Sequence, residues 1–142
     1  MKNVLPILVC TLLIFEPAYG QPRNDISVNC ETVTLEGECL LFGVSIIQLL
    51  ANPDDYDGKN VRLIGYIHFE FEGAGIYFHK EDFDRRIYAN GFWVSLAQGF
   101  SPDHCQDRYV LIEGVFDASS TGHMGLWSGT VKDITRCTQW PP

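Results

Sequence analysis

RLIGYIHFEFE, residues 62–72, is the stretch of sequence that decides the fold. Apolar residues take every second position, and the positions between them become polar toward the end of the stretch. Successive side chains of a β-strand point to opposite faces, so this alternation predicts one long strand with one face in the core. The face predicted to lie inside consists of Leu63, Gly65, Ile67, Phe69 and Phe71.

Four shorter segments downstream also predict strands. They are residues 76–78, which follow a Gly-Ala-Gly turn, and residues 91–96, 108–117 and 126–135. The inward positions of residues 108–117 are Val110, Ile112, Gly114 and Phe116. Glycine inside a strand costs stability unless the sheet bends sharply or another backbone lies close, so Gly65 and Gly114 indicate strong bending. The sequence therefore predicts a mainly β fold, a small five-stranded antiparallel barrel.

One segment ahead of these strands predicts a helix. Residues 44–52 read VSIIQLLAN, with apolar residues at helical spacing and Ser45 placed to cap the first turn. Pro53 ends the helix, and the turn after it reaches Gly58, which tolerates a positive φ. The charged residues 80–86 predict either a loop or a single helical turn. We therefore expect one short helix before the barrel.

Two parts of this pattern resemble the OB-fold-type modules of small exported bacterial proteins. They are residues 52–67 (NPDDYDGKNVRLIGYI) and residues 109–116 (YVLIEGVF). In those modules a helix and a Pro-x-x-Tyr-x-Gly-Lys turn precede a first strand that reads Val-x-x-x-Gly. The resemblance covers residues 44–136 through short elements. It implies an OB-like barrel but no particular activity, because such barrels carry many activities.

The cysteines predict two disulfides. Cys105 and Cys137 flank the last two predicted strands, and the two ends of a hairpin lie opposite each other, so these residues are expected to pair. Cys30 and Cys39 flank a shorter hairpin candidate, which predicts the second bridge. The chain-entropy model gives stabilisations of about 3.5 and about 3 kcal/mol for the two loops. A zinc site is the rival interpretation, but zinc sites usually bring two cysteines within a few residues, and these spacings do not.

The first 20 residues predict a secretory signal. Lys2 is followed by the apolar residues 4–15 and by Ala18-Tyr19-Gly20, which suits cleavage after Gly20. Spanning a bilayer takes about 20 apolar residues, so this run is too short and we expect no stable membrane insertion. Four cysteines after the leader fit an oxidising compartment. The expected location is therefore periplasmic or secreted.

The rest of the chain predicts a single domain with an arm. Residues 21–43 form an N-terminal extension that carries the disulfide hairpin, and residues 44–142 form the barrel domain. The net charge of −8 repels phosphate backbones, and the basic groove of nucleic-acid-binding OB domains is missing. We therefore expect a protein or small-ligand partner and no nucleic acid.

The most unusual segment is the loop SSTGHMGLWS, residues 119–128. Its glycines allow tight backbone, and loops held by a rigid scaffold often carry function. The residues predicted to contact a partner or ligand are Thr121, His123, Trp127 and Ser128. The alternative is a hairpin connection whose histidine caps a turn and whose tryptophan seals one end of the barrel.

A second candidate is a weak metal site on the first predicted strand. His68, Glu70 and Glu72 share one strand face, and His79 on the return strand could join them. Imidazole and carboxylate are suitable ligands for zinc or manganese. A solvated strand face needs such charges anyway, so we expect no bound metal.

Catalytic motifs are missing from the sequence. It has no Gly-x-Ser-x-Gly, no His-Glu-x-x-His and no phosphate-binding glycine loop, so we expect no cofactor. The leading hypothesis is an exported, non-enzymatic binding module. The alternatives are an exported inhibitor or immunity protein that blocks an enzyme, and a small metal-dependent enzyme.

Overall fold

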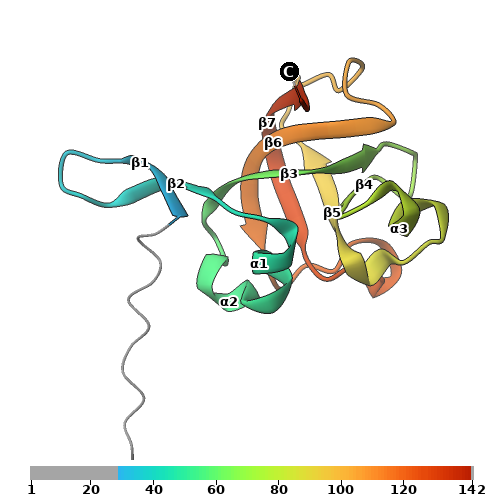
Figure 1. Cartoon of the computed structure of the whole chain (residues 1–142), viewed down its shortest axis with the longest axis horizontal. Coiled ribbons are helices and arrows are strands. Elements are labelled where there is room, and N and C mark those ends of the chain that lie inside the picture. Colours follow the sequence, from blue (N-terminus) through green and yellow to red (C-terminus); the bar gives the residue numbers. More distant parts are fainter. Residues whose placement is uncertain (1–28, 142) are drawn as a thin grey trace, which may run out of the picture.

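The structure is a computed structural model that describes residues 29–141 (Figure 1). The predicted leader, residues 1–20, and residues 21–28 of the predicted extension lie outside the described residues. The described chain is mainly β, with a hairpin arm beside a closed barrel. None of the helices in residues 29–141 has the length and apolar character needed to cross a bilayer.

Five strands close the barrel, in the order β3-β4-β5-β7-β6 with β6 returning to β3. They are β3 (Asn60–His68), β4 (Gly75–Tyr77), β5 (Gly91–Leu96), β6 (Arg108–Asp117) and β7 (Thr130–Gln139). Three successive strands are thus followed by a fourth that returns beside the first, which is the Greek-key arrangement. The predicted strands 91–96 and 108–117 are confirmed to the residue.

The expectation of a wholly antiparallel barrel is wrong at one pairing. β5 runs parallel to β7, with Trp93 opposite Thr130 and Val94 opposite Val131. The cause is the connection 97–107, which carries the chain from β5 to the far side of the barrel. β7 then runs antiparallel to β6 and fills the remaining gap beside β5. A parallel pair is the result, and it closes the cylinder.

Five of the inward side chains that the sequence predicted are fully buried in the barrel interior, and they are Leu63, Ile67, Val110, Ile112 and Phe116. The fully buried core residues include Val61, Leu63, Ile67, Ile76, Phe92, Val110, Ile112, Phe116, Val131 and Ile134. Gly65 and Gly114 are confirmed as sites of close approach. A Cβ on Gly65 would lie 2.7 Å from the Tyr77 carbonyl oxygen, and one on Gly114 would lie 2.7 Å from the Lys132 carbonyl oxygen.

The described chain contains several short helices, whereas the sequence predicted one. The predicted helix is present as α1 (Ile46–Ala51), and Ser45 and Gln48 form a capping box at its start. The chain continues into α2 (Pro53–Tyr56), because proline is well suited to a first helical turn. The charged segment forms α3 (Lys80–Asp84). Short 3₁₀ turns include η2 (Tyr88–Asn90) and η3 (His123–Gly125).

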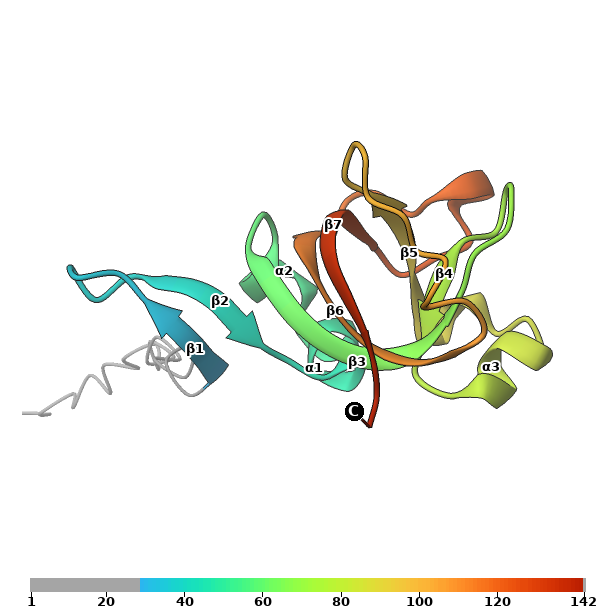
Figure 2. The ribbon, with the colours of Figure 1, turned by 90° about the horizontal axis from the view of Figure 1, so that it is seen from above.

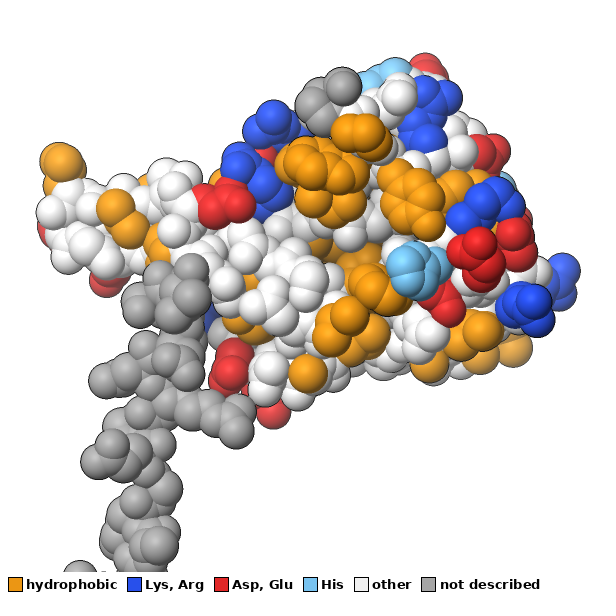
Figure 3. All heavy atoms as spheres, viewed as in Figure 1, with side chains coloured by type: hydrophobic (Ala, Val, Ile, Leu, Met, Phe, Trp, Pro, Cys, Tyr) orange, Lys and Arg blue, Asp and Glu red, His pale blue; other side chains and the backbone are white. Residues whose placement is uncertain are grey.

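The N-terminal arm is the predicted disulfide hairpin. β1 (Cys30–Val33) pairs with β2 (Cys39–Gly43), and the Cys30–Cys39 disulfide joins the first residue of one strand to the first residue of the other. β2 then pairs with the start of β3 in parallel. The arm projects away from the barrel (Figure 2), and hydrophobic side chains reach its surface (Figure 3). The Leu35 side chain at the tip is fully exposed.

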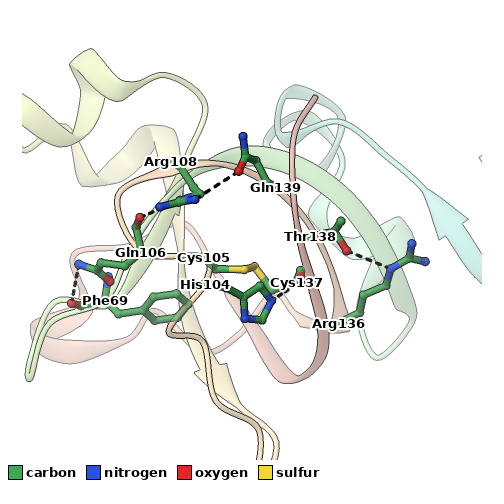
Figure 4. Close-up of a disulfide and its surroundings, with 9 residues drawn as sticks. All are labelled: Phe69, His104, Cys105, Gln106, Arg108, Arg136, Cys137, Thr138 and Gln139. Carbon is green, nitrogen blue, oxygen red and sulfur yellow. Dashed lines mark hydrogen bonds between the residues drawn. A yellow bond between two sulfur atoms is a disulfide. The ribbon is translucent and has the colours of Figure 1, made fainter. Parts of the chain in front are cut away.

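The second disulfide braces the barrel itself. Cys105 lies just before β6 and bonds to Cys137 in β7, as the sequence predicted. The bridge is buried, and its neighbours reinforce the same seam (Figure 4). His104 bonds to the Cys137 carbonyl oxygen at 2.9 Å, and the Gln106 side chain donates to the Phe69 carbonyl oxygen at 3.2 Å. These contacts tie the connection 97–107 to β7 and to the loop after β3. Two disulfides are compatible with an oxidising location.

Candidate ligand-binding site

A cavity of about 450 Å³ lies between two loops at one end of the barrel. One loop, residues 69–74, joins β3 to β4, and the other, residues 118–129, joins β6 to β7. The side chains and backbone around the cavity come from both loops and from β5 and β7. They belong to Phe71, Glu72, Trp93, Ser95, Ser120, Gly122, His123, Thr130 and Lys132.

Hydrogen bonds that the Asp117 carboxylate accepts fix the start of the loop 118–129. The Asp117 carboxylate accepts from the backbone amides of Ser119 and Ser120, both at 3.1 Å, and from the Ser119 hydroxyl at 2.8 Å. Its other oxygen accepts from Lys132 Nζ at 2.8 Å. Farther along, the Thr130 hydroxyl donates to the Ser120 carbonyl oxygen at 2.7 Å. The cavity wall on this side is therefore preorganised by the protein itself.

The pH response of this loop follows from the same bonds. Lys132, with help from Ser119 and Ser120, lowers the pKa of Asp117 from 3.8 to about 2. A depressed pKa stabilises the fold above the unfolded value, and that contribution is lost as pH falls through the folded value. We therefore expect the Ser119 and Ser120 amide NMR signals to stay constant down to about pH 4 and to titrate with a midpoint near 2. Asp117→Asn should remove this transition, and a midpoint at the ordinary aspartate value would contradict the assignment.

Trp127 is buried behind the cavity, with 4% of its surface exposed. Its ring packs over Gly75, and it lies 6.0 Å from the Trp93 ring at an angle of 74°. Gly122 fits against both rings, since a Cβ there would lie 2.7 Å from Trp93 and 2.8 Å from Trp127. A ring this deeply buried offers almost no surface to a partner or ligand, in contrast to the predicted role of Trp127 as a contact residue. The tryptophan anchors the loop to the barrel instead, which was the alternative interpretation.

The other three predicted contact residues of this loop have different positions. His123 lines the cavity and is exposed. Thr121 is also exposed, and its carbonyl oxygen accepts from the Trp127 amide at 3.2 Å. Ser128 donates its hydroxyl to the Ala89 carbonyl oxygen at 2.8 Å, which holds the loop against η2. Only His123 among the four predicted residues belongs to the cavity wall.

Sequence reasoning missed most of the other lining residues. Phe71 was expected inside the barrel, yet it is 97% exposed, because β3 ends at His68 and the next residues form a turn. Glu72 follows it into the same loop. Ser95 alternates with the buried Val94 on β5, so strand periodicity could have placed it on the outer face. Its proximity to the loop 118–129 depends on the parallel pairing, which the sequence did not predict.

The cavity combines unused polar groups with aromatic surface. No side-chain hydrogen bond of Glu72, Ser95 or His123 occurs within the described part of the chain. Lys132 adds a cation beside them, and Trp93 and Phe71 add ring surface. Ligand sites typically combine ring surface with a few convergent polar groups. The arrangement can therefore hold a small molecule through hydrogen bonds and stacking.

The weak metal candidates do not converge. His68 Nδ1 lies 2.5 Å from Asp107 Oδ1, and this bond lowers the pKa of Asp107. Glu70 Oε2 is 3.7 Å from His68 Nε2, whereas Glu72 lines the cavity described above. His79 is the residue before α3. Across residues 29–141, no three histidine, cysteine or acidic side chains are grouped closely enough to hold a metal ion.

Comparison with protein-family models, with curated proteins and with solved structures finds no match to this chain.

Proposed function

We propose that this chain is an exported, non-enzymatic binding module that holds a small ligand in the cavity between the loops 69–74 and 118–129. The observation that carries the proposal is the composition of the wall. Both loops contribute to one cavity of about 450 Å³, in which Glu72, Ser95 and His123 keep free hydrogen-bonding groups. This volume lies within the range of about 300–1,000 Å³ that is usual for ligand sites.

The proposed barrel type supports the same site. OB-like barrels are five-stranded Greek-key barrels that bind ligands beside the loop between strands one and two and the loop between strands four and five. The corresponding loops here are residues 69–74 and 118–129, counting β3 as the first barrel strand. The resemblance of residues 44–136 to exported OB-type modules and the leader-like residues 1–20 support export.

Blocking the cavity tests this proposal. Ser95→Trp places a large ring in the cavity, whereas Gln98→Trp adds the same ring to an exposed turn outside it. The mature oxidised protein is incubated with the dialysable fraction of cells that produce it and is examined by native mass spectrometry. We expect a ligand mass on the wild type and on Gln98→Trp, and none on Ser95→Trp. A mass retained by all three proteins, or found on none, would overturn the assignment.

A second candidate function, inhibition of an enzyme, is favoured by the arm. The Cys30–Cys39 disulfide and the Thr34 hydroxyl, which accepts from the Glu36 and Glu38 amides, hold the tip rigid around the exposed Leu35. A rigid apolar tip flanked by carboxylates suits insertion into a basic active-site cleft, because little freedom is lost on binding.

The inhibitor candidate makes its own prediction. Inhibition of secreted hydrolases with basic active sites should fall at least tenfold in Leu35→Asp, since burying an unpaired charge costs several times the thermal energy. Val33→Asp is the matched control on the same arm, away from the tip turn. Equal inhibition by the wild type and Leu35→Asp across such a panel would remove this candidate.

A further inference from the structure

A second cavity, of about 280 Å³, lies on the outside of β4 under α3 and η2. It is separate from the cavity proposed above, because the two share no lining residue. Tyr77 is fully buried and forms the floor, while Phe83 and Tyr88 are partly buried and form the walls. Three charged side chains complete the lining, and they belong to Glu70, Asp84 and Arg86.

The aromatic rings of this cavity are held at fixed angles. The Tyr77 and Phe83 ring centroids are 5.6 Å apart at 60°. Trp127 lies 5.1 Å from both Tyr77 and Tyr88, at angles of 55° and 60°, and so buttresses floor and wall together. Burial, Tyr88 and Glu70 raise the pKa of Tyr77, so its ring stays uncharged. Tyr77, Phe83 and Tyr88 line one cavity, and we call these three residues the cage, because an organic cation is attracted to neutral aromatic rings.

The charges around the opening are of both signs. Asp84 binds Lys80 at 2.7 Å, and Glu70 Oε2 lies 3.7 Å from His68 Nε2. Among the ion pairs of residues 29–141, none involves Arg86. The opening therefore offers two carboxylates to a cation and one unpaired guanidinium to an anion. A ligand with both charges would complement all three.

We propose that this cavity binds a small zwitterion that carries a methylated ammonium and a carboxylate. The ammonium lies among the rings of Tyr77, Phe83 and Tyr88 beside Glu70, and the carboxylate pairs with Arg86. A methylated ammonium suits the cage better than a bare one, because its methyl groups fill apolar ring surface and need no hydrogen-bond acceptors. A bidentate bond from a guanidinium to a carboxylate fixes the orientation.

Three probes separate the contributions to binding. Glycine betaine carries both charges, choline carries only the ammonium, and 3,3-dimethylbutan-1-ol is the neutral analogue of choline with the same shape. We expect choline to bind at least tenfold more tightly than the neutral analogue, and betaine to bind more tightly than choline. Affinities are measured by calorimetry. The indole NMR signal of Trp127 reports the location, because this ring touches the cage but not the opening.

Two variants test the roles of the charged side chains. Glu70→Gln should weaken choline and betaine about tenfold, whereas Glu81→Gln, a matched control on α3 that lines neither cavity, should change neither. Arg86→Gln should weaken betaine and leave choline unchanged. Thermal unfolding of each variant establishes that the fold is kept, and all of the substituted side chains are exposed.

The outcomes that overturn this inference are specific. Equal affinity for choline and its neutral analogue would show an apolar hollow, and unchanged betaine affinity in Arg86→Gln would remove the carboxylate contact. Absence of any shift of the Trp127 indole signal at saturating betaine would also refute the site. Ser95→Trp blocks only the first cavity, so this variant should still bind betaine. Failure of the proposed function and failure of this inference are therefore distinguishable.

Discussion

Replacing Cys105 and Cys137 together by alanine is expected to lower the free energy of unfolding by about 3 to 4 kcal/mol. The bridge closes a loop with a sequence separation of 32, and Cys105 is completely buried. Without it, residues 105–137 gain conformational freedom in the unfolded chain, and a void opens in the core of the folded one. Urea unfolding of the oxidised protein, followed by far-UV circular dichroism, measures the change.

The Cys30–Cys39 bridge is the matched control for this prediction. It lies in the projecting arm, so its removal frays a hairpin that the barrel does not need. Replacing both residues by alanine should lower the free energy of barrel unfolding by less than about 1 kcal/mol. A larger loss from the arm bridge than from the barrel bridge would show that the arm unfolds cooperatively with the core.

Replacing Phe116 by alanine is expected to lower the free energy of unfolding by about 3–5 kcal/mol. The ring is completely buried in the barrel and packs edge to face on Phe92, with centroids 5.2 Å apart. Alanine would leave a void that rigid strands on all sides cannot fill. The measurement is again urea unfolding, with the slope compared between variants to confirm two-state behaviour.

Phe71 provides the control for Phe116, because it is the same residue type with 97% of its surface exposed. Phe71→Ala should change the free energy of unfolding by no more than about 0.5 kcal/mol. A loss below about 1.5 kcal/mol for Phe116→Ala would contradict its place in the barrel core. A large loss for Phe71→Ala would mean that β3 continues beyond His68, as the sequence pattern alone suggested.

The barrel could be predicted from the sequence because each strand carries its own local pattern. Alternation in residues 108–117 identified the inward residues, and the spacing of the cysteines relative to the predicted hairpins identified both disulfides. Ser45 identified the start of α1, since capping depends on local hydrogen bonds. These features follow from patterns within one strand, one helix start or one hairpin, even where the hairpin brings together residues 32 apart, as it does for Cys105 and Cys137.

Features that depend on distant residues could not be predicted in the same way. The parallel pairing of β5 with β7 follows from how the connection 97–107 crosses the barrel, and no local pattern encodes it. The end of β3 at His68 was missed because the alternation continues through Phe71 while the backbone already turns. After His68, the side chain of Gln106 takes the place of a pairing strand, because it hydrogen-bonds both the amide and the carbonyl group of Phe69.

In the candidate site, too, features set by local sequence could be predicted, and features that depend on distant residues could not. The sequence singled out the loop 118–129 from its composition, and His123 does line the cavity. The predicted role of Trp127 as a contact residue differs from its observed role as a buried anchor, because a large ring in a glycine-rich loop is compatible with both roles. Only the tertiary contacts with Gly75 and Trp93 distinguish these two roles. Glu72 and Ser95 come from separate elements, and their meeting at one cavity is a property of the closed barrel.

The most direct test of the proposed ligand-binding cavity is an NMR titration of the mature oxidised protein with the dialysable fraction of cells that produce it. We expect amide shifts centred on residues 71–72, 93–95, 120–123 and 130–132 in the wild type, and no such shifts in Ser95→Trp. If the amide signals of these four segments stay unchanged in the wild type at the highest concentration of the fraction, the proposed ligand-binding cavity is contradicted.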